Sequence, residues 1–226
     1  MAHTLNDKVA LITGAAGGLG VAVTQAFLEG GAKVAGVSRH IKADQFQHPN
    51  FSAFPGDLAS GAAARKVVES VAAQLGRIDA LVHVMGGFAG GKSVADTDDA
   101  TMEQMLDLNF RSGFFMARAV LPVMRRQRSG RILVVASRQG AEPGAMVGAY
   151  SASKAAMIAL VKSIALENKD AGITANTVLP GGMATPGNQG SNLVATEEVA
   201  ALLAHLASDA AAQITGAALP VYGRQL

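Results

Sequence analysis

The sequence predicts an α/β fold in which a doubly wound parallel sheet is covered by helices on both faces. Short apolar runs alternate along the chain with longer amphipathic stretches, which is the pattern of repeated β-α-β units. The apolar runs are continuous, as expected of parallel strands that are buried on both sides. With 226 residues, the chain is expected to form one domain that spans residues 1–226.

Seven short apolar runs are expected to form the strands. The first, Val9–Thr13, leads directly into a cluster of glycines. In open parallel sheets, ligands bind beyond the carboxyl ends of the strands, so the functional residues should follow these runs. The expected strands are residues 9–13, 33–37, 51–54, 80–84, 132–136, 173–179 and 217–221.

Apolar residues that recur every three or four positions predict the helices. Ser60 is placed to cap the N-terminus of a helix over residues 60–75. The longest stretch, 101–128, contains Pro122, so we expect it to be bent or interrupted near the proline. No clear helix follows Arg39. The expected helices are residues 20–29, 60–75, 101–128, 149–168 and 197–207.

The composition excludes several classes of protein. Half of the residues are hydrophobic and 16% are charged, which excludes a disordered chain. A net charge of +2 is too balanced for an electrostatic nucleic-acid binder. The chain has no cysteine, and its five histidines are scattered, so neither disulfides nor a metal site are expected. No apolar run is long enough for a membrane span, and no signal peptide is recognisable, so we expect a cytoplasmic protein.

A glycine-rich turn follows the first expected strand. Three of its glycines have the spacing G-x-x-x-G-x-G, and a helix follows. Glycines let the backbone approach a pyrophosphate, and the helix N-terminus offers unpaired N–H groups to that anion. We therefore expect a dinucleotide to be bound by Gly14, Gly18, Leu19 and Gly20.

The end of the second expected strand bears on the choice of cofactor. An acidic residue there would accept hydrogen bonds from a ribose 2′-hydroxyl, whereas an arginine would suit a 2′-phosphate. The strand is followed by Ser38 and Arg39, and no acidic residue occurs between Glu29 and Asp44. NADP(H) is therefore favoured over NAD(H), unless Arg39 is only a solvated loop charge.

A tyrosine and a lysine are spaced for proton transfer. Tyr150 and Lys154 are four residues apart on an expected helix and should share one face. A nearby ammonium favours the phenolate, so we expect it to lower the pKa of Tyr150 toward the range useful for carbonyl reduction. Ser137, after the fifth strand, could bind the reacting carbonyl oxygen. Asn109, facing the same edge, could hold a water or a backbone group in a proton relay.

These motifs together resemble the short-chain dehydrogenase/reductase family in its Tyr-x-x-x-Lys form. The resemblance implies a Rossmann-type sheet of about seven strands. It also implies hydride transfer between a nicotinamide and a carbonyl/alcohol pair, such as a ketone or a 3-oxoacyl-type substrate. The matching stretches are residues 13–20, 56–58, 109, 130–137, 150–154, 176–181, 185, 208–209 and 214–216.

The resemblance also implies roles for individual residues. Tyr150 would be the acid–base, and Lys154 would lower its pKa and bind the nicotinamide ribose. Ser137 would orient the substrate, and Asn109 would join the proton relay. Further cofactor contacts are implied for Asp57 and Leu58 at the adenine, for Gly86, and for Gly181, Met183 and Thr185 at the nicotinamide. The family forms tetramers or dimers, so a homo-oligomer built partly on the helices that carry Asn109 and Tyr150 is expected.

The chain departs from the family after the fourth strand. His83, Val84, Met85 and Gly86 replace the usual Asn-Asn-Ala-Gly, and only the glycine remains. His83 precedes the strand end, so we expect it to be packed or backbone-bonded rather than catalytic. The following loop, residues 86–91, together with residues 185–188, locally resembles dihydropteridine reductases.

The substrate side is expected to be open. Residues 185–197 leave little room for a helical lid, which suggests a bulky or carrier-bound substrate, or a site completed by a neighbouring subunit. Phe88 could stack on a flat substrate or simply cap the pocket mouth. The residues expected to line the substrate site are Phe88, Ser137, Arg138 and Met146.

Three functions follow from these observations. The first is an NADP(H)-dependent carbonyl reductase or alcohol dehydrogenase. The second is a dihydropteridine or quinonoid reductase. The third is a non-catalytic NADP(H)-binding sensor or scaffold. The Tyr150 and Lys154 pair argues against it, because a non-catalytic protein has no physical need for a tuned tyrosine.

Overall fold

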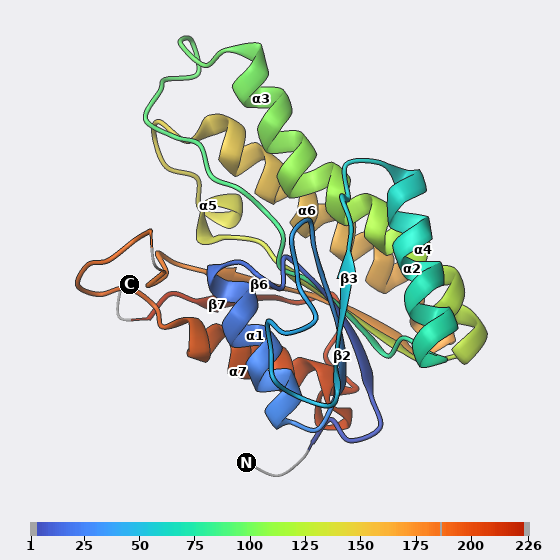
Figure 1. Ribbon diagram of the computed structural model, residues 1–226. Coiled ribbons are helices and arrows are strands. Elements are labelled where there is room, and N and C mark those ends of the chain that lie inside the picture. The colour runs from blue at the N-terminus through green and yellow to red at the C-terminus, as the bar shows by residue number, and fades with distance from the viewer. Residues whose placement is uncertain (1–3, 186, 224–226) are drawn as a thin grey trace.

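A seven-stranded sheet runs through the centre of the computed structural model, which describes residues 4–185 and 187–223 (Figure 1). Its strand order is β3-β2-β1-β4-β5-β6-β7, and every neighbouring pair is parallel. This confirms the predicted fold class. The strands are β1 Val9–Thr13, β2 Lys33–Ser38, β3 Phe51–Pro55, β4 Ala80–His83, β5 Gly130–Val135, β6 Ile173–Pro180 and β7 Ala218–Val221.

Helices cover both faces of the sheet (Figure 1). The helices α1 and α7 pack on one face, and α2, α4 and α6 pack on the other. The α-helices are α1 Gly18–Glu29, α2 Gly61–Leu75, α3 Asp99–Leu106, α4 Ser112–Gln127, α5 Arg138–Ala141, α6 Gly148–Glu167 and α7 Thr196–Ala207. Short 3₁₀ turns follow α6 at Lys169–Ala171 and α7 at Asp209–Ala211.

Two apolar cores fix the sheet between these layers. Successive residues of β1 enter opposite cores, because strand side chains alternate between the two faces. Ile12 packs in the core beneath α1 and α7, and Leu11 packs in the core beneath α2, α4 and α6. The predicted cap of α2 is confirmed, since the hydroxyl of Ser60 accepts a hydrogen bond from the amide of Ala63 at 3.2 Å.

The longest predicted helix, 101–128, is interrupted at a different place from the one expected. A π-helical turn, Asp107–Arg111, separates α3 from α4, and α4 runs unbroken through Pro122. The interruption predicted near the proline is therefore wrong. Pro122 lies on the exposed side of α4, where water can hydrate the carbonyl that a proline leaves without its hydrogen bond.

Helix α6 could cross a membrane by length and composition, with 20 residues and a mean hydropathy of 1.2 over its best window. It instead packs against β5, β6 and α4, and its buried residues include Lys154 and Ser153. It is a core helix of the sheet's second face. Among the described residues, neither 39–50 nor the segment between β6 and α7 contains a helix, as the sequence predicted.

Candidate active site

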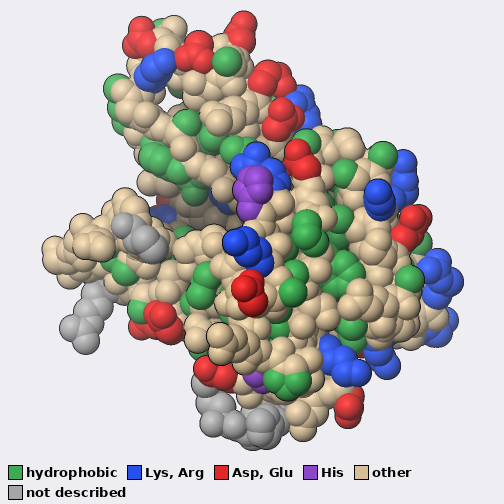
Figure 2. Space-filling view, viewed as in Figure 1, with side chains coloured by type: hydrophobic (Ala, Val, Ile, Leu, Met, Phe, Trp, Pro, Cys, Tyr) green, Lys and Arg blue, Asp and Glu red, His purple; other side chains and the backbone are tan. Residues whose placement is uncertain are grey.

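Two cavities lie along the carboxyl edge of the sheet. The first, of about 490 Å³, lies beyond β1, β2, β3 and β4. The second, of about 920 Å³, lies beyond β5 and β6. Strand order reverses at β1, whose neighbours are β2 and β4, and ligands of doubly wound sheets bind at such a switch point. On the face shown in Figure 2, the surface is deeply hollowed between the α3 region and the segment that follows β6.

The glycine turn forms one wall of the first cavity. Gly14 has a φ of +69°, and a Cβ there would lie 2.9 Å from the amide nitrogen of Met85. A Cβ on Gly20 would collide with the carbonyl oxygen of Gly14. The amide of Gly14 donates to the carbonyl of Val37 at 2.8 Å, which ties the turn to the end of β2. Only glycine permits these backbone approaches.

The first cavity contains the predicted nucleotide-binding residues. The hydroxyl of Ser38 accepts a hydrogen bond from the amide of Ala16 at 3.3 Å, so it braces the glycine turn. The cavity also contains His40, Val84 and Met85, which the sequence analysis did not assign to it. The predicted residues that line it are Gly14, Gly18, Leu19, Gly20, Ser38, Arg39, Asp57, Leu58 and Gly86.

The residues of this cavity fit a dinucleotide. Helix α1 begins there at Gly18, after Gly17, and no side-chain hydrogen bond caps its N-terminus among the described residues. The first N–H groups of α1 are thus available to a pyrophosphate, whose charge also suits the positive end of the helix dipole. The glycines remove the side chains that would otherwise fill this place.

Tyr150 and Ser137 meet on the wall of the second cavity. Burial raises the pKa of Tyr150 above its usual value, and a side-chain hydrogen bond with Ser137 acts in the opposite direction. The expected lowering of this pKa by Lys154 is therefore wrong for the protein alone, because burial outweighs the other effects. Ser137 lies two residues beyond β5, where its hydroxyl caps α5 by accepting from the amide of Gln139 at 3.2 Å.

Lys154 lies beneath Tyr150, one turn further along α6. Its ammonium donates to the carbonyl of Val135 at 3.2 Å and lies 5.9 Å from the centre of the Tyr150 ring. The side chain is buried, and this burial lowers the pKa of Lys154 to about 8. A cation is thus held close to the tyrosine with little surrounding water.

Asn109 is held in the π-helical turn by side-chain hydrogen bonds to Gly87, Ser153 and the sulfur of Met105, the last at 3.6 Å. Its amide nitrogen donates to the carbonyl of Gly87 at 3.0 Å and to the hydroxyl of Ser153 at 3.1 Å. Its amide oxygen accepts from the amide of Gly87 at 2.9 Å. The prediction that Asn109 could hold a backbone group matches this contact. A Cβ on Gly86 would lie 2.8 Å from the oxygen of Asn109 and 3.1 Å from the nitrogen of Lys154, so these two polar groups converge there.

The second cavity takes most of the predicted substrate and nicotinamide residues. Phe88 is 68% exposed and meets the ring of Tyr150 edge-on, with 5.0 Å between ring centres. Arg138 forms an ion pair with Glu142 at 2.8 Å and lies over the ring of Tyr222. The spacing of four residues on a helix could have predicted that pair. The predicted residues lining this cavity are Phe88, Ser137, Arg138, Tyr150, Gly181, Met183 and Thr185.

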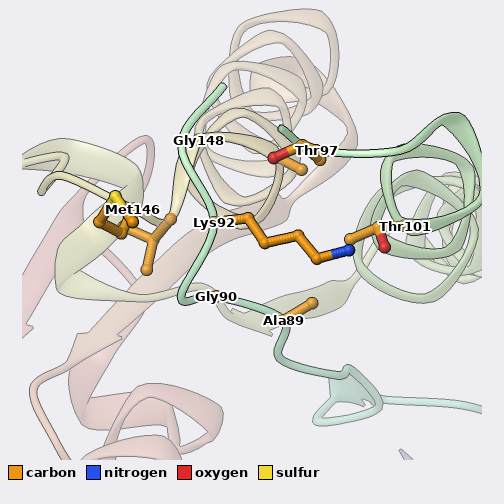
Figure 3. Close-up of a pocket in the computed structure, with 9 residues that line it drawn as sticks. Ala89, Gly90, Lys92, Thr97, Thr101, Met146 and Gly148 are labelled. Carbon is orange, nitrogen blue, oxygen red and sulfur yellow. The ribbon is translucent and has the colours of Figure 1, made fainter. Parts of the chain in front are cut away.

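Met146 is the exception among these predictions. It lines a separate cavity of about 130 Å³, shown in Figure 3, in which Lys92 extends toward Thr101. Its φ is +64°, and its carbonyl accepts from the amide of Gly91 at 2.8 Å. Met146 is not among the described residues that line the cavity of Tyr150, so its assignment to that cavity is wrong.

His83 is buried, as the sequence predicted. Its ring nitrogens pair with the side-chain hydroxyls of Thr13 and Ser112 rather than with the backbone. Burial, together with the charge of Lys154, lowers the pKa of His83 to about 3. It is therefore neutral at ordinary pH.

The chain is similar to known proteins along most of its length. Residues 8–195 match the family model described as short chain dehydrogenase. A short-chain dehydrogenase/reductase of Talaromyces verruculosus is 34% identical over 96% of this chain and 96% of the relative. The 3-oxoacyl-acyl-carrier-protein reductase of Salmonella typhimurium is 31% identical over 97% of this chain and 98% of the relative.

A solved structure extends the likeness to the whole fold. The 3-ketoacyl-(acyl-carrier-protein) reductase of Brucella melitensis, crystallised with NADH, superimposes with a TM-score of 0.90 at 26% identity. The match covers 97% of this chain and 98% of that chain. The protein belongs to the short-chain dehydrogenase/reductase family. It is accordingly an oxidoreductase of a family that uses a nicotinamide cofactor, NAD or NADP.

Proposed function

We propose that this enzyme transfers a hydride between NADP(H) and a carbonyl/alcohol pair, on a ketone or a 3-oxoacyl-type substrate. The observation that carries the proposal is the cluster of Tyr150, Ser137 and Lys154 at the second cavity. A phenol hydrogen-bonded to a hydroxyl faces the open space, and a buried ammonium lies behind it. This is the arrangement needed to deliver one proton to a carbonyl oxygen.

The proton steps follow from these contacts. When bound, the nicotinamide supplies the hydride in reduction and accepts it in oxidation. Tyr150 donates its proton to the carbonyl oxygen, and Ser137 orients that oxygen by a hydrogen bond. The charge of Lys154 stabilises the tyrosinate left behind. The donated proton leaves in the alcohol, so Tyr150 needs a replacement from solvent. Asn109 holds Ser153 and the Gly87 backbone beside this lysine, where a relay would pass that proton to Tyr150.

The preference for NADP(H) rests on the end of β2. Arg39 lines the first cavity, and the cavity's only acidic residue among those described is Asp57, beyond β3. A guanidinium can form two parallel hydrogen bonds with a phosphate. Arg39 would therefore bind the 2′-phosphate, with the glycine turn at the pyrophosphate and Lys154 at the nicotinamide ribose.

The substrate is proposed to be bulky or carried on another molecule. The second cavity has a volume of about 920 Å³, and the described residues between β6 and α7 provide no helical lid over it. Two relatives named for reduction of carrier-bound 3-oxoacyl or 3-ketoacyl groups support this proposal. The open wall leaves room for such a carrier.

One observation favours a second candidate, a dihydropteridine or quinonoid reductase. Phe88 is a large, exposed aromatic side chain that lies beside the predicted acid–base. A flat heteroaromatic ring could stack on it while facing Tyr150. In this case the hydride would go to a ring nitrogen system, and Ser137 would have no part in the reaction.

The test is oxidation of NADPH by the purified protein with a panel of acceptors. The panel contains 3-oxoacyl thioesters, ketones, aldehydes, diketones, quinones and a quinonoid dihydropterin. Tyr150→Phe runs beside the wild type, and Tyr222→Phe is the matched control, because these are the two tyrosines of the chain. Carbonyl reduction that is lost only in Tyr150→Phe supports the proposal. Turnover that survives in Tyr150→Phe overturns the assigned acid–base, and activity restricted to the dihydropterin selects the second candidate.

The proposal extends to assembly and location. Phe110, Phe114 and Phe115 form a partly exposed aromatic row on the π turn and α4, with the guanidinium of Arg118 over two of the rings. Partly exposed rings clustered on one helix suit an interface between copies. We therefore infer a homodimer or homotetramer that uses α4 and α6. Independently of this surface, we propose that the enzyme works in the cytoplasm.

A further inference from the structure

His83 is a buried, ionisable group that the proposed reaction does not use. It ends β4, is 1% exposed and stands where the family pattern has an asparagine. The charged group whose field acts on it is Lys154, which together with burial disfavours the imidazolium. The ring is therefore a neutral hydrogen-bonding group with one donor and one acceptor.

The neighbours of His83 fix which nitrogen carries the hydrogen. The hydroxyl of Ser112 donates to the carbonyl of Leu108 at 2.8 Å, so it can only accept from the Nε2 of His83 at 3.3 Å. The Nδ1 of His83 is then an acceptor, and the hydroxyl of Thr13 donates to it at 2.8 Å. The same hydroxyl accepts from the amide of Met85 at 3.4 Å. In this series of hydrogen bonds, each donor therefore faces an acceptor.

The first end of this series of hydrogen bonds, at Thr13, lies at the nucleotide cavity. Thr13 is the last residue of β1 and immediately precedes Gly14. The backbone of Gly14 lies against that of Met85, and both residues line the cavity of about 490 Å³. The Thr13 bond of His83 therefore holds two facing walls of this cavity together.

The second end lies at the π-helical turn. Ser112 follows this turn directly and bonds to Leu108 inside it. Helix α4 also packs closely on the imidazole, since a Cβ on Gly113 would lie 3.1 Å from the Nε2 of His83. The Ser112 bond therefore holds the turn that carries Asn109, the partner of Ser153.

We propose that His83 is a positioning residue that links the nucleotide cavity, through Thr13, with the π-helical turn of Asn109, through Ser112. The link rests on the proposed function only in assigning NADP(H) to the first cavity. Each end acts on a different part of the site. The two ends can therefore be separated by substitution.

Two amide substitutions separate the ends. His83→Asn places an amide near the position of Nδ1, so it retains the bond with Thr13 and cannot reach Ser112. His83→Gln places its amide near the position of Nε2, so it retains the bond with Ser112 and leaves the hydroxyl hydrogen of Thr13 without its acceptor. Thr13→Val and Ser112→Ala remove these bonds from the other side, together with the Thr13 bond to Met85 and the Ser112 bond to Leu108.

Two measurements report on the ends without any substrate. Calorimetric titration with NADPH reports on the nucleotide cavity. Ultraviolet absorbance of tyrosinate reports the pKa of Tyr150, and in a Tyr222→Phe background it reports this residue alone, because the chain has two tyrosines and no tryptophan.

The expected result is a crossed pattern. His83→Gln and Thr13→Val raise the Kd for NADPH about fivefold, the factor expected for one lost buried hydrogen bond, and leave the Tyr150 pKa unchanged. His83→Asn and Ser112→Ala leave the Kd unchanged. They lower the pKa of Tyr150, because a loosened Asn109 turn admits water to the site and lessens the burial that raises this pKa.

Other results overturn the proposal. If all four variants change both readouts together, or change neither, His83 only fills space. Circular dichroism identifies any histidine variant that fails to fold, and the Thr13 and Ser112 variants then decide. A wild-type protein that binds neither NADPH nor NADH would overturn the proposed function and the link to the cavity. A protein that binds NADPH but reduces no acceptor of the panel would contradict only the proposed reaction. The Kd for NADPH and the pKa of Tyr150 would still decide the role of His83.

Discussion

Replacing Gly86 by alanine should remove most of the turnover while the protein remains folded. The added methyl group would lie 2.8 Å from the amide oxygen of Asn109 and 3.1 Å from the nitrogen of Lys154. Ordinary van der Waals contact begins at about 3.4 Å, so the amide oxygen of Asn109 must move by about half an ångström and the nitrogen of Lys154 by a few tenths of an ångström. The loop itself is anchored, because the neighbouring Gly87 makes two hydrogen bonds with Asn109.

The expected losses of stability and of kcat follow from the contacts that the added methyl group breaks. Displacing the amide of Asn109 breaks one or two buried hydrogen bonds, which costs about 1–3 kcal/mol of stability. A displacement of this size at the reacting groups should lower kcat by about 10- to 100-fold, because misplacement by about 1 Å can cost 100-fold. The KM for the carbonyl substrate should change less, since the second cavity does not include Gly86.

The assay measures NADPH oxidation with the acceptor that the wild type turns over fastest, alongside thermal unfolding of each protein. Gly190→Ala is the matched control, since a Cβ there meets only the end of Leu193 at 3.9 Å. If Gly86→Ala retains kcat within twofold of the wild type, Asn109 and Lys154 do not need the positions described above. The roles assigned to Asn109 and Lys154 would then be refuted.

Three further predictions concern other parts of the molecule. Arg39→Ala should raise the Kd for NADPH at least tenfold and change the Kd for NADH by less than twofold, as measured by calorimetry; equal effects would contradict the NADP(H) assignment. The pKa of Lys154 falls from its ordinary value of 10.5 to about 8 on folding, so the unfolded chain binds more protons between these values and stability should rise with pH there. Lys154→Met should abolish this rise and stabilise the protein at pH 7, by about 2–3 kcal/mol in denaturant unfolding, and an unchanged stability profile would show that the ammonium is not buried. Phe114→Glu should shift the mass measured by light scattering to that of a monomer, and an unchanged mass would place the interface elsewhere.

The sequence predicted well whatever is specified by local pattern and by topology. The glycine turn, the end of β2 and the carboxyl ends of β3 and β4 converge on one cavity. This convergence follows from parallel strands that all end at the same edge. Tyr150 and Ser137 also meet across 13 positions of sequence, because α6 returns along β5. These placements required no knowledge of side-chain packing.

Features that depend on contacts between residues distant in the chain could not be predicted from the sequence. The π-helical turn is stabilised by hydrogen bonds from Asn109 to Gly87 and Ser153, and no local pattern reveals them. Met146 lines a neighbouring cavity rather than that of Tyr150, and its positive φ is not readable from the local sequence. The extent to which Tyr150 is buried, which decides the direction of its pKa shift, is likewise a property of the packed structure.

The opposite pKa shifts of Tyr150 and Lys154 have one physical cause and one consequence. Burial disfavours the charged form of each group, so it raises the pKa of the phenol and lowers that of the ammonium to about 8. At pH 7 the tyrosine therefore holds its proton and the lysine is still mostly charged. This is the pair of states from which a proton can be delivered to a carbonyl oxygen. The tyrosinate then formed lies beside a cation in a poorly solvated place, where their attraction is stronger than in water. The burial that makes the resting tyrosine a weak acid therefore also strengthens the charge pair formed when it gives up its proton.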